Sequence, residues 1–218
     1  MSVIVLKKIN HIFLEIKKNT PIIIYRNFFK KNTCKKIISI CHENYSYKYN
    51  NKKSKNKFIN FSSIDVLPSS VKVDRIFRTF VISDYFISKF PEIRNLITFQ
   101  EKILKPKFKK EIYRKVQIIH YPKGGGFFDK HHHTRYPTNY IIIITLSKKF
   151  KDFKQGVTNF VVNKKNISLE KFNIDMGDLI LFRFDIPHYI SPVDPGEDLT
   201  FNKKGRWTLV LPVYHEKF

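Results

Sequence analysis

The sequence predicts a mostly β protein with supporting helices, an α+β fold whose core is a β-sandwich or β-barrel. From Glu111 onward, runs of β-branched and aromatic residues alternate with turn residues, which is typical of these all-β architectures. The first half instead contains apolar residues at helical spacing. No Gly/Ser-rich linker separates the halves. We therefore expect one domain over 1–218, with mainly helical support and a β-strand in 1–110 and the β core in 111–218.

The first half is expected to contain a strand, a helix, a loop and a pair of helices. Residues 21–25, Pro-Ile-Ile-Ile-Tyr, form a β-branched run that favours a strand. Apolar residues at helical spacing predict an amphipathic helix over 33–44. Residues 45–64 are polar and rich in lysine, which predicts an exposed loop. The apolar pattern of 83–104 is interrupted at Pro91, so we expect two helices that meet at this proline.

The second half is expected to supply the strands of the β core. Its apolar runs are short and are bounded by turn residues, as is usual for strands. No run approaches the ~20 apolar residues of a membrane-spanning helix, so no membrane association is expected. The predicted strands are 113–121, 139–146, 157–162, 167–169, 179–184, 188–193 and 206–213.

The charge of the chain is strongly positive. There are 41 Lys and Arg against 18 Asp and Glu, a formal net charge of +23. Such a surface attracts nucleic acids and other anions. The lysines are scattered along the chain, however, and accompany abundant Ile, Asn, Phe and Tyr, as an AT-rich coding sequence would produce. Since no nucleic-acid-binding motif is present, we predict a solvated basic surface and no nucleic-acid partner, with attraction of another anionic molecule as the alternative.

The two cysteines indicate a reducing compartment. Cys34 and Cys41 lie seven residues apart in the predicted helix, where a disulfide is geometrically implausible. We expect both to be reduced core residues of a cytoplasmic protein. The first residues place apolar side chains before lysines, which is the reverse of the order in a secretory signal.

The most specific feature of the sequence is a glycine-rich stretch, 121–133, which reads Tyr-Pro-Lys-Gly-Gly-Gly-Phe-Phe-Asp-Lys-His-His-His. Its residues His131 and His133 are alternate residues of an extended segment, so their side chains point to the same face. His188 begins a later predicted strand, where the mouth of a barrel would bring it near His131. Facially arranged ligands with open positions are typical of non-haem Fe(II) oxygenases.

Four blocks of the chain, in the correct order, resemble the Fe(II)- and 2-oxoglutarate-dependent dioxygenase superfamily, most closely its prolyl-4-hydroxylase-type branch. They are the opening strand and helix at 21–38, the "strand, Tyr-x-x-Gly, metal His" block at 116–131, the "Gly-Gly-x-Thr-x-Phe" strand at 155–160, and the block carrying the distal metal His at 175–188. The resemblance covers residues 20–214. It implies a double-stranded β-helix, or jelly roll, and the use of Fe(II), 2-oxoglutarate and O2.

The resemblance places the metal on His131, His133 and His188, with one departure from the family. The family has His-x-Asp or His-x-Glu where this chain has His-x-His. Either His133 replaces the carboxylate, or a carboxylate elsewhere completes the triad, with Asp129 or Asp185 nearest, or the third position is left to water, as in the related halogenases. We favour His133, because histidine is a competent Fe(II) ligand and this residue has the right direction.

The resemblance also implies a basic residue that binds the distal carboxylate of 2-oxoglutarate, and we assign it to Arg206. Arginine binds carboxylates in a bidentate geometry. Arg206 lies farther beyond His188 than is usual in the family, which predicts a loop insertion over 194–204. Arg183 is the rival candidate and is expected to serve structure. The predicted helpers of the co-substrate carboxylate are Tyr121, Thr208 and Asn139.

The resemblance therefore implies an enzyme, a 2-oxoglutarate-dependent Fe(II) dioxygenase. It would convert 2-oxoglutarate and O2 to succinate and CO2 while hydroxylating a small anionic or amino-acid-like metabolite. Two alternatives stay open: a three-His iron dioxygenase that does not use 2-oxoglutarate, and a non-catalytic jelly-roll binding protein. Hydroxylation of a peptide or protein ranks below a small-molecule substrate, and a homodimer is compatible with the sequence.

Overall fold

The computed structural model of the chain describes residues 3–45, 57–65, 74–103, 113–133 and 139–214. The strands are β1 (Val3–Leu6), β2 (Ile22–Tyr25), β3 (Ile59–Asp65), β4 (Arg75–Ile82), β5 (Tyr113–Arg114), β6 (Gln117–Lys123), β7 (Gly126–His131), β8 (Tyr140–Thr145), β9 (Thr158–Val162), β10 (Lys165–Ser168), β11 (Leu179–Arg183), β12 (His188–Val193), β13 (Thr200–Val210) and β14 (Val213–Tyr214). The helices are α1 (Asn10–Lys17), α2 (Lys31–Glu43), α3 (Asp84–Lys89), α4 (Pro91–Ile103) and the 3-10 turn η2 (Leu169–Phe172).

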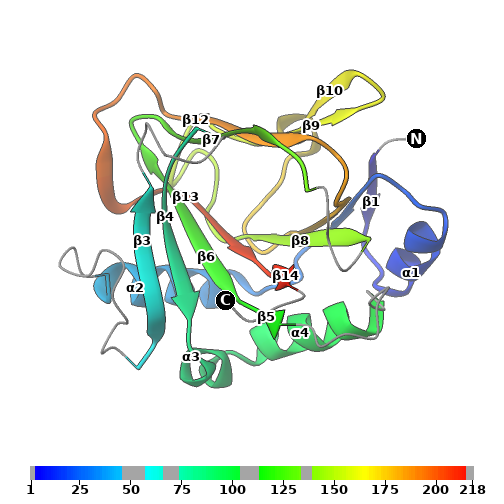
Figure 1. The fold of residues 1–218 in the computed structure, drawn as a ribbon, viewed down its shortest axis with the longest axis horizontal. Coiled ribbons are helices and arrows are strands. Elements are labelled where there is room, and N and C mark those ends of the chain that lie inside the picture. The colour runs from blue at the N-terminus through cyan, green and yellow to red at the C-terminus, as the bar shows by residue number, and fades with distance from the viewer. Residues whose placement is uncertain (1–2, 46–56, 66–73, 104–112, 134–138, 215–218) are drawn as a thin grey trace.

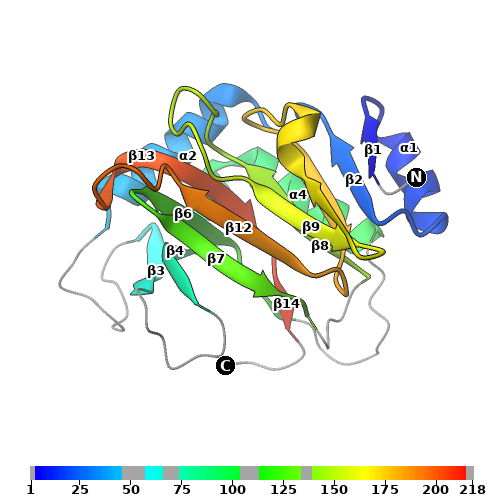
Figure 2. The same ribbon diagram turned by 90° about the horizontal axis from the view of Figure 1, so that it is seen from above.

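Twelve of the strands form one curled sheet with two facing layers (Figures 1 and 2). The larger layer has the order β1-β2-β11-β8-β13-β6-β4, with β3 paired to β4, and the smaller layer continues as β4-β7-β12-β9-β10. All pairs in this sheet are antiparallel except β1 with β2. The mostly β fold with supporting helices is therefore confirmed.

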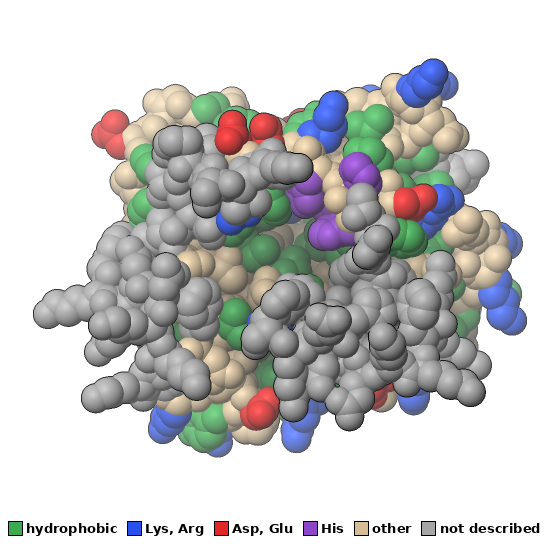
Figure 3. All heavy atoms as spheres, viewed as in Figure 1, with side chains coloured by type: hydrophobic (Ala, Val, Ile, Leu, Met, Phe, Trp, Pro, Cys, Tyr) green, Lys and Arg blue, Asp and Glu red, His purple; other side chains and the backbone are tan. Residues whose placement is uncertain are grey.

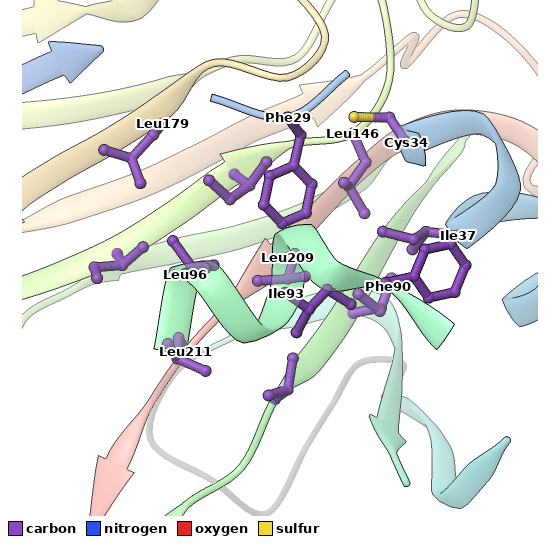
Figure 4. Close-up of a cluster of buried hydrophobic side chains, with 14 of the residues drawn as sticks. Phe29, Cys34, Ile37, Phe90, Ile93, Leu96, Leu146, Leu179, Leu209 and Leu211 are labelled. Atoms are coloured by element: carbon purple, nitrogen blue, oxygen red, sulfur yellow. The ribbon is translucent and has the colours of Figure 1, made fainter. Parts of the chain in front are cut away.

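Buried hydrophobic side chains pack on both sides of the larger layer. On β11, Leu179 and Leu181 pack with the helices, whereas Ile180 and Phe182 face the interior between the two layers. This division follows from the alternation of side chains along a strand. Figure 4 shows the helix-side part, where Ile93 and other apolar side chains of α4 lie over the sheet. The interior between the layers is the part that holds the candidate site.

The predicted helices are confirmed. The amphipathic helix expected over 33–44 is α2, and the strand expected before it is β2. The pair expected to meet at Pro91 is α3 and α4, with Pro91 as the first residue of α4, where its missing N–H costs no helical hydrogen bond. Ser83 caps α3 by accepting a hydrogen bond of 3.1 Å from the backbone N–H of Phe86. Among the described residues, no helix combines the length and apolar character needed to cross a bilayer.

Three expectations need correction. Residues 59–65 form strand β3, although 45–64 was expected to be an exposed loop; residues 46–56 of that segment lie outside the described part of the chain. The half expected to hold one strand, 1–110, contains four described strands. The loop insertion expected over 194–204 is only partly a loop, because β13 begins at Thr200.

Both cysteines are free and buried in the helix-side core, as predicted. Burial raises the pKa of the Cys34 thiol to about 12 and that of Cys41 also well above its usual range. Since the thiolate is the reactive form, we expect neither cysteine to react with iodoacetamide in the native protein at pH 8. Mass spectrometry before and after addition of a denaturant would measure this, with two alkylated sites appearing only on unfolding. Rapid labelling of the native protein would contradict the packing described here.

Candidate metal site and carboxylate cavity

Three histidines converge at one end of the interior. His131 is the last residue of β7, His188 is the first residue of β12, and these two residues are paired in the sheet. His133 lies just beyond β7, where its backbone N–H donates to the carbonyl of Phe184 at 3.3 Å. One ring nitrogen from each of the three lies within 4.8 Å of the others. In Figure 3 the histidine side chains gather beside a hollow in the surface.

The backbone fixes the orientation of two of the imidazoles. His131 Nδ1 lies 2.8 Å from the carbonyl oxygen of Asp129, and His188 Nδ1 lies 3.0 Å from that of Ile186. Because a carbonyl can only accept, each Nδ1 carries the proton and each Nε2 presents its lone pair. A ring held in this way through its second nitrogen is typical of histidines that ligate metals.

The same histidines are held in the neutral form. Burial, followed by the neighbouring His131, lowers the pKa of His188 to about 3 and that of His133 to about 4. Burial also lowers the pKa of His131. Neutral imidazole is the form that binds a metal, so protons do not compete with a metal ion at neutral pH. Three convergent neutral imidazoles fit Fe(II), as they fit other first-row metals.

Neither carboxylate considered as a third ligand belongs to this group. Within the described ranges, the cluster around His131 and His188 contains no Asp or Glu. Asp185 is ion-paired with Arg183, whose Nε donates to it at 3.0 Å. Asp129 is exposed and approaches the group through its backbone carbonyl. The geometry therefore favours His133 over both carboxylates, and the ion pair gives Arg183 the structural role expected of it.

A buried arginine lies deeper in the interior. Arg206 of β13 is 4% exposed, its Nη2 donates to Thr158 Oγ1 at 2.5 Å, and its guanidinium carbon lies 5.4 Å from the ring centre of Tyr121. Burial lowers its pKa to about 10, so it is still a cation at neutral pH. Its Nη1 is buried without a hydrogen-bond partner among the described residues, as is Oγ1 of Thr145 on β8. Both residues line a cavity of about 360 Å³.

The position of Arg206 is set by a glycine. Gly205 has φ +123°, and a Cβ there would lie 2.5 Å from the carbonyl oxygen of Tyr121 and 2.6 Å from His120 Nε2. Only glycine allows β13 to approach β6 so closely. The pairing between these strands shifts register between Thr200 and Gly205, and the residue after the glycine is then directed into the interior.

The strand register relates the arginine to the histidines through β9. Thr158, which accepts the hydrogen bond from Arg206, lies two residues before Phe160 on β9, and Phe160 is paired with His188. Two residues of a strand span about 6.6 Å. This span suits a five-carbon dicarboxylate with one end at the histidines and the other at the guanidinium.

The structure brings together some of the predicted carboxylate helpers. The buried ring of Tyr121 lies against Arg206. Thr208 is also buried, two residues after Arg206 on β13 and therefore on the same face of the strand, and it is paired with Thr145. Asn139 is exposed at the opposite end of β8 from Thr145, so the structure does not bring it to the cavity. Sequence reasoning gave no role to Thr145 or Thr158. Thr158 is the threonine of the family-like block at 155–160, whereas nothing in the apolar run of β8 marks Thr145 as a polar group of the interior.

No family model and no curated protein matches this sequence. Three solved structures, however, are similar in fold. A prolyl-4-hydroxylase from Pseudomonas putida has a TM-score of 0.61 at 11% identity, over 95% of this chain and 98% of that one. A 2OG-Fe(II) oxygenase family oxidoreductase from Burkholderia pseudomallei has a TM-score of 0.54 at 12% identity, over 99% and 96%.

The third is a prolyl hydroxylase from Trichoplax adhaerens, in complex with a peptide fragment of the oxygen degradation domain of hypoxia inducible factor. It has a TM-score of 0.59 at 16% identity, over 94% of this chain and 88% of that one. Each of the three alignments extends over nearly the whole of both chains. The chain therefore has the fold of the prolyl hydroxylases and of the 2OG-Fe(II) oxygenase family, which confirms the jelly roll expected from the four sequence blocks.

Proposed function

We propose that the protein is an Fe(II)- and 2-oxoglutarate-dependent oxygenase in which His131, His133 and His188 hold the iron. The observation that carries this proposal is the combination of three convergent imidazoles with a buried arginine that contacts β9 two residues from the partner of His188. A metal site alone would fit many proteins. Nη1 of Arg206 is a buried cationic donor without a hydrogen-bond partner among the described residues, so this interior also favours a bound anion.

The side chains around Arg206 fit the distal carboxylate of 2-oxoglutarate. Arg206 Nη1 would donate to one carboxylate oxygen, and Thr145 Oγ1 could donate to the other. Thr158 holds the guanidinium through Nη2 and Tyr121 supports it through its ring, so the arginine is oriented before the ligand arrives. Preorganisation of this kind lowers the entropy cost of binding.

When bound, Fe(II), 2-oxoglutarate and O2 supply the oxidation of a substrate C–H bond, with release of succinate and CO2. The chain contributes orientation and exclusion of water. The Nδ1 bonds of His131 and His188 direct both Nε2 atoms to one point. The buried ring of Phe160, 6.2 Å from that of His188, and the ring of Phe182, 4.7 Å from it, cover the site with apolar surface.

For the substrate we infer a small anionic or amino-acid-like metabolite, supported by the excess of 41 basic over 18 acidic residues. A peptide is the second candidate, because the Trichoplax prolyl hydroxylase of the same fold holds a peptide. Succinate formation with candidate metabolites and with proline-containing peptides would separate the two. Turnover coupled to peptides alone would overturn the inference of a small substrate.

Anaerobic titration of the Fe(II) protein with 2-oxoglutarate tests the proposal. We expect the metal-to-ligand charge-transfer absorption that arises when the keto acid chelates iron. Iron binding without this band would favour a three-His dioxygenase that does not use 2-oxoglutarate. An iron content that is unchanged in His131→Ala/His188→Ala would favour a non-catalytic binding protein on the same scaffold.

The histidine at position 133 should strengthen the hold on the anionic co-substrate. An iron with three neutral ligands carries more positive charge than one with a carboxylate ligand. We therefore expect His133→Asp to retain iron and to bind 2-oxoglutarate about tenfold more weakly, or about 1.4 kcal/mol. Titration of the charge-transfer band measures this, with His132→Asp as the control for charge. Tighter binding in His133→Asp than in the control would contradict His133 as a ligand.

A further inference from the structure

The cavity next to Arg206 opens at the end of the barrel away from the histidines. None of the three histidines lines it. Thr145 lies at the end of β8, whereas the opposite end of that strand pairs with Arg183, next to the Phe184 carbonyl that binds His133. In Figure 2 the β8–β9 connection and η2 lie at one edge of the molecule, and β7 runs toward the opposite edge. We call this opening the rear mouth.

Interior and surface residues meet in this cavity. Its inner wall comes from four strands, with Thr145 on β8, Thr158 on β9, Ile180 on β11 and Arg206 on β13. Its outer rim comes from two segments far apart in the sequence: Lys148, Lys149 and Phe150 on one side, and Glu170, Asn173 and Asp175 on the other. The cavity therefore connects the buried guanidinium with the surface.

An ion pair crosses the rear mouth. Lys149 Nζ contacts Glu170 Oε1, and this contact joins the two segments of the rim. The lysine also lies 4.8 Å from the ring centre of Phe150. Phe150 is 80% exposed and has φ +65°, an unfavourable conformation for a bulky residue. Ion pairs this close to solvent contribute about 0–1 kcal/mol, so thermal motion breaks this contact readily.

We propose that small dicarboxylates reach Arg206 through the rear mouth and are guided there by Lys149. When the ion pair between Lys149 and Glu170 opens, they can leave by the same route. The ligand class rests on the proposed function, since Arg206 is there the partner of the co-substrate's distal carboxylate. A substrate at the histidine end then leaves the path for 2-oxoglutarate and succinate open. Co-substrate and substrate have separate routes to the same interior.

The test uses glutarate and the metal-free full-length chain. Glutarate has the two carboxylates but no keto group, so its binding reports on Arg206 and not on iron. NMR line shapes of its methylene protons give association and dissociation rates. The variants are Lys149→Glu, Glu170→Lys, the charge swap Lys149→Glu/Glu170→Lys, and Lys151→Glu. Lys151 is the matched control, because it lies in the same exposed loop but does not line the cavity.

We expect Lys149→Glu to slow association about tenfold, since two carboxylates then face each other at the mouth. Glu170→Lys should accelerate it, the charge swap should return it near the wild-type rate, and Lys151→Glu should leave it unchanged. Equal slowing by Lys149→Glu and Lys151→Glu would overturn the proposal, as would failure of the wild-type chain to bind glutarate. If the rates meet these expectations but Fe(II) and 2-oxoglutarate give no charge-transfer band, dicarboxylate entry through the rear mouth is supported and the oxygenase function is refuted.

Discussion

Replacing His188 with alanine is expected to abolish tight iron binding. His188 is 6% exposed and presents Nε2 to the other two histidines, so its loss removes one of three ligands and leaves no nearby donor among the described residues to replace it. Removing a residue that only orients a metal-binding histidine typically lowers the affinity for the metal about 10–100-fold. Loss of the ligand itself should therefore cost more than about 100-fold. Iron per chain after anaerobic loading and desalting measures the effect.

The chain offers a control for this experiment within the same loop. His132 lies between two of the proposed ligands, but it is exposed and does not belong to the group. His132→Ala should retain wild-type iron content, and His131→Ala should lose iron as His188→Ala does. Equal iron content in all three variants would show that the histidine group does not hold the metal.

Replacing Arg206 with methionine is expected to weaken 2-oxoglutarate binding strongly while making the metal-free protein more stable. The side chain is a buried cation with no anionic partner among the described residues. Without it the distal carboxylate loses its charged donor, which typically costs at least about 2 kcal/mol, or about 30-fold in affinity. Methionine also removes the cost of burying the charge, so the free energy of unfolding should rise.

Two measurements on Arg206→Met test this prediction. Titration of the charge-transfer band gives the affinity for 2-oxoglutarate, and urea unfolding of the metal-free chain gives the free energy of unfolding. The opposite signs separate a binding role from a structural one, because a purely structural arginine would lower stability when removed. Arg183→Met is the control, since that side chain lies near the surface in an ion pair with Asp185. It should change neither the affinity nor the stability appreciably. A loss of 2-oxoglutarate binding in Arg183→Met alone would make Arg183 the anchor.

The second half of the fold could be predicted because its strands are short apolar runs bounded by turns. β4 could not. Its residues Arg75 and Arg78 interrupt the apolar pattern, yet Arg78 is 1% exposed. Its guanidinium lies 4.9–5.6 Å from the centres of four aromatic rings, and Nε donates to His120 Nδ1 at 3.1 Å. All of these partners except Phe80 come from distant parts of the chain, so only tertiary structure explains an arginine at this position.

The beginning of β13 could not be predicted from the sequence for a related reason. Residues 200–204 are polar except for Phe201 and read as a loop, but they continue the strand because distant side chains bind their backbone. Trp207 Nε1 donates to the carbonyl of Lys203 at 3.0 Å, and His120 Nε2 lies 2.8 Å from that of Lys204. The polar side chains here face solvent, so no hydrophobic pattern marks the strand.

For the site, the alternation of an extended segment placed His131 and His133 on one face, and the order of the family-like blocks added His188 to them. Asn139 shows the limit of that reasoning, since proximity to a strand does not say which end of the barrel a residue occupies. No feature of the sequence predicted the rear mouth. It depends on two loops, around Lys149 and Glu170, that meet only in the folded chain.

We propose that one imidazole from each of His131, His133 and His188 binds a single Fe(II) ion. X-ray absorption spectroscopy of the anaerobic Fe(II) protein tests this most directly, because imidazole rings give characteristic outer-shell scattering that can be counted. We predict three imidazoles per iron, falling to two in His133→Ala. Two imidazoles in the wild-type protein, with no change in His133→Ala, would show that His133 does not bind the iron.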